Sequence, residues 1–240
     1  MTPIRRALVM EARLNSGRFG LSMALCVLSV VVAVTVADGL MTVLPLWAAL
    51  AWYRYGRADT IERAELRAAL GLSRADRVRG RVALIGVETL VLLLTSALWL
   101  LIAPVLDLGT TVRPGPTFTL SGPPGLSEIL LVLVGTGQAA LVLLLTAIVV
   151  GGDCTTHRPA RSMAVLSIIV YLGAGLLSAM LAGLPLSMLE LSGSPAVPYL
   201  LVGVGVVVVG AVLLLVLRRR VRAWSDVLDS GAATRMRAAA

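Results

Sequence analysis

The chain has few of the residues that enzymes most often use for chemistry. Its 240 residues include one histidine, His157, two cysteines and no lysine, and only 14% of them are charged. A single histidine excludes the paired-histidine motifs of metalloproteases and leaves no second imidazole to act as a base. The sequence also contains no phosphate-binding loop of the G-x-x-x-x-G-K type. We therefore expect that the chain is not an enzyme by itself and does not hydrolyse ATP alone.

The scarcity of cysteine and of aromatic residues excludes further classes. Cys26 lies in an apolar run and Cys154 in a polar stretch, so we expect no disulfide between them. Cys154 and His157 have a C-x-x-H spacing, but no second pair of ligands accompanies them, and we predict no metal site. Aromatic residues make up 4% of the chain, so the formal net charge of +8 does not indicate a nucleic-acid partner.

Apolar residues dominate what remains. They make up 58% of the chain, which is more than soluble domains contain and predicts an all-α, polytopic membrane protein surrounded by lipid. We predict a six-helix transmembrane domain over residues 20–217, with spans at about 20–37, 40–54, 82–103, 129–150, 163–184 and 199–217. The second span is short for a crossing of about 20 residues, so we expect it to continue into the headgroup layer. Residues 1–19 would form an interfacial segment and residues 218–240 a cytoplasmic tail.

The arginines predict the orientation of the chain, because basic residues concentrate on the cytoplasmic side of a membrane. Placing the N terminus, residues 54–81, residues 153–161 and the tail in the cytoplasm leaves all but Arg113 of the 21 arginines inside. We therefore predict that both termini are cytoplasmic and that the protein crosses the plasma membrane several times.

The longest polar, charge-dense segment between apolar blocks covers residues 59–81, and its pattern predicts two helices. Asp59 with Glu62, and Ser73 with Asp76, have the spacing of helix N-terminal capping pairs. Gly71 lies where the first helix needs a residue that tolerates the left-handed conformation. We expect a helix over about 60–70, a turn at 71–72 and a new helix that starts at Ser73.

The expected helix over 60–70 has two apolar stripes, which favours contacts on two sides. The first stripe consists of Ile61, Ala64, Ala68 and Leu72, and the second, roughly opposite, consists of Leu66 and Leu70. A solvated cytoplasmic loop helix is an equally good interpretation of these residues, because charged runs usually form solvated faces.

This segment resembles the cytoplasmic signature of ABC-2-type transporter permeases. The resemblance rests on Glu65-Leu66-Arg67, on Leu70-Gly71-Leu72-Ser73-Arg74-Ala75-Asp76 and on Val78-Arg79-Gly80-Arg81. The family usually reads leucines, then leucine-proline-x-serine-arginine, then an acidic, a small apolar and a basic residue. Here Gly71 replaces the proline, and it too breaks a helix. The six-span layout and the arginines after the last span extend the resemblance over nearly the whole chain.

The resemblance implies a permease subunit of an ABC transporter, an exporter that forms the translocation path. ATP and Mg²⁺ would be bound by separate ATP-binding-cassette subunits, with no cofactor on this chain, and a second copy or a sister permease would complete the path. A cytoplasmic coupling segment, residues 57–81, would contact the ATPase. The residues implied in this coupling are Glu62, Glu65, Leu66, Arg67, Leu70, Gly71, Ser73, Arg74 and Asp76.

Two polar residues within the predicted spans are candidates for an intramembrane role. Glu88 follows Arg81 by about 10 Å along a helix, a depth at which a carboxylate normally faces protein or water. It could line the pathway, pair with a cytoplasmic arginine such as Arg81, or extend to the interface. Gln138 could bind a substrate or join two helices.

Small residues recur every four positions in the fifth predicted span. Gly175, Ala179 and Gly183 would form a ridge that another helix can approach closely, either inside the chain or at a dimer seam.

A different class of function also fits the sequence, namely a structural or accessory integral membrane protein that transports nothing.

Overall fold

The described part of the chain is entirely helical in its regular structure. The computed structural model describes residues 3–36, 41–55, 69–103, 126–151, 161–187 and 196–226. The helices are α1 (Pro3–Leu14), α2 (Ser16–Thr35), α3 (Val43–Ala49), α4 (Ala51–Tyr55), α6 (Arg74–Ile102), α7 (Leu126–Val150), α8 (Arg161–Ser187) and α9 (Ala196–Asp226). The all-helical class predicted from the sequence is confirmed.

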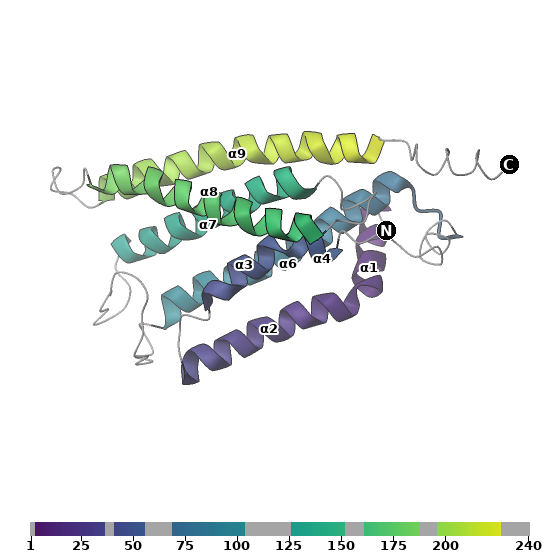
Figure 1. The fold of residues 1–240 in the computed structure, drawn as a ribbon, viewed down its shortest axis with the longest axis horizontal. Helices are drawn as coiled ribbons and strands as arrows, with labels where there is room; N and C mark the ends of the chain where they lie inside the picture. The colour runs from purple at the N-terminus through teal and green to yellow at the C-terminus, as the bar shows by residue number, and fades with distance from the viewer. Residues whose placement is uncertain are drawn as a thin grey trace.

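The long helices lie side by side along one direction, and α1 turns away from this direction at Asn15 (Figure 1). Helix α6 lies between α2 and α7, and α9 packs along α7 and α8. Within the residues that the structure describes, five helices are long and apolar enough to cross a bilayer: α2, α6, α7, α8 and α9. The described chain therefore has the composition and the layout of a multi-pass membrane protein.

The segment expected to form the second span is not among these five helices. It consists of α3 and α4, of seven and five residues, which are separated at Leu50. The Leu50 N–H is shared between the carbonyls of Leu46 at 3.3 Å and Trp47 at 3.2 Å. The Trp47 carbonyl also accepts a hydrogen bond from Nη1 of Arg54 at 2.6 Å. This side chain therefore satisfies a backbone group at the break, and the prediction of a continuous span over 40–54 is not confirmed.

Two helices extend beyond the predicted spans. Helix α6 begins at Arg74, capped by Ser73 as the sequence predicts, and runs without interruption into the span predicted from residue 82. Helix α9 continues past Leu217 to Asp226. This extension contains four arginines of the predicted tail, and arginine is a good helix former.

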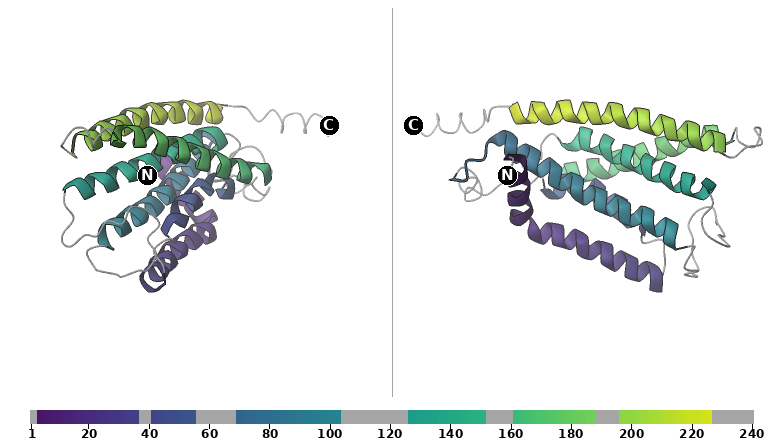
Figure 2. Two further views of the ribbon diagram at one scale, coloured as in Figure 1. Left: turned by 60° about the vertical axis from the view of Figure 1, so that its left-hand side comes forward. Right: turned by 180° about the vertical axis from the view of Figure 1, so that it is seen from behind.

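The core consists of two clusters of buried apolar side chains. One includes Leu44, Leu92 and Trp99, and the other includes Trp52, Tyr55 and Trp224. The second cluster marks the end of the bundle where α1, the end of α4, the start of α6 and the end of α9 meet, which we call the arginine-rich end (Figure 2). Helices α8 and α9 are hardly covered, because only 6% and 0% of their most apolar windows are buried.

Candidate functional site

The start of α6 has the local structure that the sequence predicts. The backbone N–H of Asp76 donates to Oγ of Ser73 at 3.1 Å, and the backbone N–H of Ser73 donates to Oδ2 of Asp76 at 3.2 Å. Gly71 has a φ of 65°, in the left-handed region. The capping box and the left-handed conformation of Gly71 are therefore confirmed. These contacts fix where α6 begins, at the point where the coupling segment would meet it.

The rest of the predicted coupling segment lies mostly outside the described residues. This applies to the expected helix over 60–70 and to Glu62, Glu65, Leu66 and Arg67. Leu70 is described, and 57% of its surface is exposed. An exposed leucine at the start of a capped helix is available for contact with a partner.

Substitution of Gly71 tests the turn before α6. We expect Gly71→Ala to lower the free energy of unfolding by about 1 kcal/mol, because in the left-handed region the Cβ of alanine lies too close to the following carbonyl oxygen. Gly71→Asn is the matched control and should cost less, since asparagine adopts this conformation more readily. Thermal unfolding of both variants in detergent, followed by circular dichroism, measures the difference. Equal stabilities of the glycine and alanine proteins would contradict the positive φ.

Glu88 lies at the junction of three helices and is fully buried, with 0% exposure. Its Oε1 forms an ion pair with Nη2 of Arg54 from α4 and accepts a hydrogen bond from Oγ of Ser22 from α2 at 2.6 Å. The indole N–H of Trp47 donates to Ser22 at 3.0 Å, and the Arg54 guanidinium lies 3.9 Å from the centroid of the Trp47 ring. Of the roles considered for Glu88, burial and pairing favour a structural one.

The arginine that the sequence suggested as a partner for Glu88 has a different one. Nε and Nη2 of Arg81 each lie 3.4 Å from Oε2 of Glu11 in α1. Both side chains are buried, with 3% and 2% exposure. The pairing differs because α1 folds back onto the start of α6, so that Glu11 reaches Arg81, and Arg54 reaches Glu88. Helices α1 and α6 also touch closely at Gly80, where an added Cβ would come within 2.9 Å of the Ala7 backbone.

Polar contacts between these two pairs close a ring. Nδ2 of Asn15 donates to Oε2 of Glu11 at 3.2 Å, and Nη1 of Arg18 lies 3.4 Å from Oδ1 of Asn15. The same Nη1 donates to the backbone carbonyl of Arg54 at 2.8 Å. The ring leaves α6 at Arg81 and returns to it at Glu88. We call it the polar ring, formed by Glu11, Asn15, Arg18, Arg54, Arg81 and Glu88.

The sequence contained one signal for the part of the ring on α1 and α2 that was not recognised. Residues spaced by about one helical turn form the buried face of these helices, and this face consists of small and polar side chains: Ala7, Glu11, Asn15, Ser22, Cys26, Ser29 and Ala33. A glutamate and an asparagine one turn apart within a basic, amphipathic segment indicate partners on a neighbouring helix.

The residues of the polar ring are buried or half-buried, and their contacts can hold helices together. Its ion pairs are buried, and their hydrogen bonds are nearly complete, because in the Arg54–Glu88 pair only Nε of Arg54 and Oε2 of Glu88 are buried without a hydrogen-bond partner among the described residues. Among the residues that the structure describes, no three histidine, cysteine or acidic side chains form a group that could hold a metal ion. The ring therefore ties α1, α2 and α4 to α6.

The other predicted intramembrane residues do not join the ring. Gln138 is partly buried on α7. On α8, Ala179 is exposed, and no atom outside the immediate backbone lies within 4 Å of a Cβ added at Gly175. At these two positions the ridge is not used for packing inside the described chain. The surroundings of Gly183 lie outside what the structure describes.

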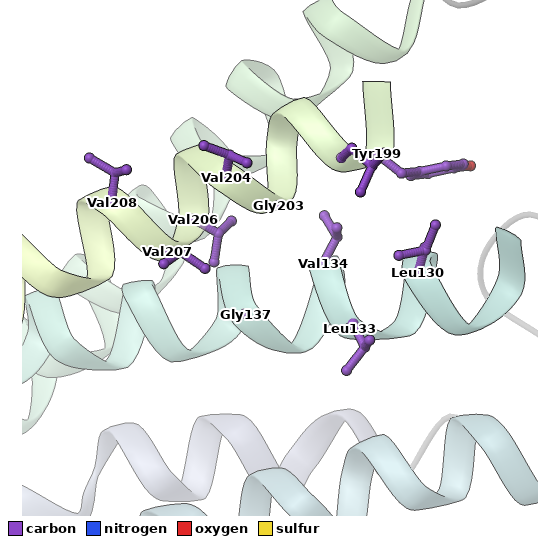
Figure 3. A pocket seen from close by; sticks show the side chains of 11 residues that line it. Leu130, Leu133, Val134, Gly137, Tyr199, Gly203, Val204, Val206, Val207 and Val208 are labelled. Carbon is purple, nitrogen blue, oxygen red and sulfur yellow. The ribbon is translucent and has the colours of Figure 1, made fainter. Parts of the chain in front are cut away.

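A shallow groove lies between α7 and α9, with a volume of about 490 Å³ (Figure 3). Its walls are almost entirely aliphatic, with Leu133 and Val134 on one helix and Val204 and Val207 on the other. Gly137 forms part of the floor, where an added Cβ would lie 2.6 Å from Val206. Apart from Tyr199 with its hydroxyl group, the lining side chains are aliphatic, so the groove suits contact with lipid chains.

The described helices thus have the character of a multi-pass helical membrane protein, with two buried ion pairs near one end. Comparisons of the chain with protein-family models, with curated protein sequences and with solved structures found no match.

Proposed function

We propose that this chain is the permease subunit of an ABC-2-type transporter, an exporter, and that the segment 59–81 couples it to separate ATP-binding subunits. The observation that carries the proposal is the continuity of α6. The stretch that resembles the family signature ends in a capped helix that runs without interruption from Arg74 to Ile102. Twenty-nine residues span about 43 Å. A force applied at Leu70 or Ser73 would therefore displace α6 as one unit.

The polar ring supports this proposal because it connects α6 to three other helices. A displacement of α6 acts on α1 through Glu11 and on α4 and α2 through Glu88. Packed helices change between discrete arrangements, so a docking contact can bias the permease toward one of two states. ATP and Mg²⁺ would bind to the partner ATPase, and α6 of this chain would transmit the resulting movement.

Six crossings with both termini in the cytoplasm are part of the proposal. Helices α2 and α6 both run away from the arginine-rich end, and α3 and α4 carry the chain back between them (Figures 1 and 2). The start of α1 and the end of α9 lie at this same end. The arginine distribution supports a cytoplasmic location for that end.

A second permease, identical or a sister chain, would complete the translocation path. The exposed faces of α8 and α9 support this part of the proposal, because they are apolar and not covered within the described chain. Gly175 and Ala179 on α8 leave room for a helix from another subunit.

Co-purification with the candidate ATPase tests the coupling. The test variant is Leu70→Asp, and the matched control is Ala223→Asp near the end of α9. Both residues are exposed at the arginine-rich end, and both variants change the net charge equally. We expect wild type and the control to retain the ATPase and its stimulated activity, whereas Leu70→Asp loses at least tenfold in affinity because a charge enters an apolar contact.

Two results would contradict the proposed function. If no ATP-binding-cassette protein co-purifies with the wild type, the alternative of a structural or accessory membrane protein replaces it. If Leu70→Asp binds and stimulates the ATPase as the control does, the coupling segment is wrongly assigned.

A further inference from the structure

Four arginines follow the apolar run of α9, at the point where the helix reaches the arginine-rich end. Arg218, Arg219, Arg220 and Arg222 come directly after Leu217, and all four side chains are exposed. The helix continues beyond them to Asp226. The helix therefore fixes the direction in which each of these side chains leaves the backbone.

The rotation of α9 is fixed by Trp224, which is 9% exposed. Its ring meets that of Trp52 edge to face, with centroids 6.2 Å apart. Gly151 lies against both indoles, because a Cβ added there would come within 2.9 Å of each. The face of α9 that carries Trp224 thus points into the bundle.

Helical geometry places three of the arginines on the opposite face. With 3.6 residues per turn, Arg218, Arg219 and Arg222 fall at about 120° to 160° from Trp224 around the helix. Arg220 lies on the Trp224 side instead, with its guanidinium 5.8 Å from the centroid of that ring. We call Arg218, Arg219 and Arg222 the outward arginine face.

The depth of this face matches the headgroup layer of a membrane. None of the most apolar window of α9 is buried within the described chain, so the side of α9 that faces away from α7 is open to lipid. The arginines lie within about 8 Å of the end of the apolar run, at a rise of about 1.5 Å per residue. The headgroup region adds roughly 5 to 8 Å on each side of the hydrocarbon core.

We infer that the outward arginine face binds the phosphate groups of anionic phospholipids. A guanidinium presents paired donors that match phosphate oxygens, and each basic residue next to a span strengthens the attraction to anionic lipid by roughly fivefold. The face points sideways from the bundle into lipid, whereas a soluble ATPase would approach the end of the bundle. The inference does not depend on transport.

Retention of phosphatidylglycerol tests the inference. The full chain is placed in nanodiscs with equal amounts of phosphatidylglycerol and phosphatidylcholine, and the lipids still bound after extraction are counted by native mass spectrometry. The test variant is Arg218→Gln, Arg219→Gln, Arg222→Gln. The control is Arg5→Gln, Arg6→Gln, Arg13→Gln, which removes the same number of exposed arginines from α1.

We expect wild type and the α1 control to retain phosphatidylglycerol over phosphatidylcholine by about tenfold or more, and the α9 variant to lose most of this preference. The preference of the wild type should also fall at high salt, because headgroup contacts are screened. An α9 variant that keeps the full preference, or an equal loss in both variants, would overturn the inference. Loss of ATPase binding with unchanged lipid retention would reassign the face to a protein partner.

Discussion

Replacing Arg54 by methionine is expected to lower the free energy of unfolding by about 3 to 5 kcal/mol, because it leaves the carboxylate of Glu88 buried without its cation. Glu88 is fully buried, and the Arg54 side chain is only 12% exposed, so water screens neither group well. The substitution also removes the hydrogen bond to the Trp47 carbonyl at the break between α3 and α4. Unfolding in mixed micelles by added SDS, followed by circular dichroism, measures the loss.

Two further variants show whether the pair itself is responsible. Arg54→Met combined with Glu88→Met should recover much of the lost stability, because no uncompensated charge then remains. Arg79→Met on α6 is the matched control, since Arg79 is exposed, and should change stability by no more than about 0.5 kcal/mol. If Arg54→Met is as stable as Arg79→Met, the polar ring does not hold these helices together.

A methyl group at Gly80 is expected to separate α1 from α6. A Cβ at this position would lie 2.9 Å from the carbonyl carbon of Ala7 and 3.0 Å from its Cβ, and these atoms cannot move without the helix. We expect Gly80→Ala to cost about 1 to 3 kcal/mol, which exceeds the gain of up to about 1 kcal/mol from alanine in a helix. The same unfolding experiment measures the cost, and faster trypsin cleavage within α1 reports its release.

Gly86→Ala is the control for this prediction, because Gly86 lies on the same helix with no other atom within 4 Å of an added Cβ. This variant should be as stable as wild type or more stable. A Gly80→Ala protein that behaves like Gly86→Ala would show that α1 is not packed against α6.

Local features of the chain were predictable because they depend on residues close in sequence. The capping box at Ser73 and the left-handed Gly71 follow from side chains within three positions of each other. The long apolar helices follow from composition, since about 20 apolar residues in a row have few other stable structures in lipid.

Contacts between distant segments could not be predicted in the same way. Arg81 was a suggested partner for Glu88 because it lies near it in the sequence, whereas the observed partner, Arg54, comes from another helix. Glu11 reaches Arg81 only because the chain turns at Asn15. The break at Leu50 likewise depends on where the Arg54 side chain lies, and hydropathy contains no information about that.

The uneven burial of the described helices has a consequence for how the protein is assembled during synthesis. Among the described residues, every buried apolar side chain of the core lies between Ala7 and Val150 except Trp224. The ribosome completes this part before it begins α8 and α9, and segments generally fold in the order of synthesis. The packed core can therefore form first. Helices α8 and α9 then pack against it, and the contact between Trp224 and Trp52 forms last.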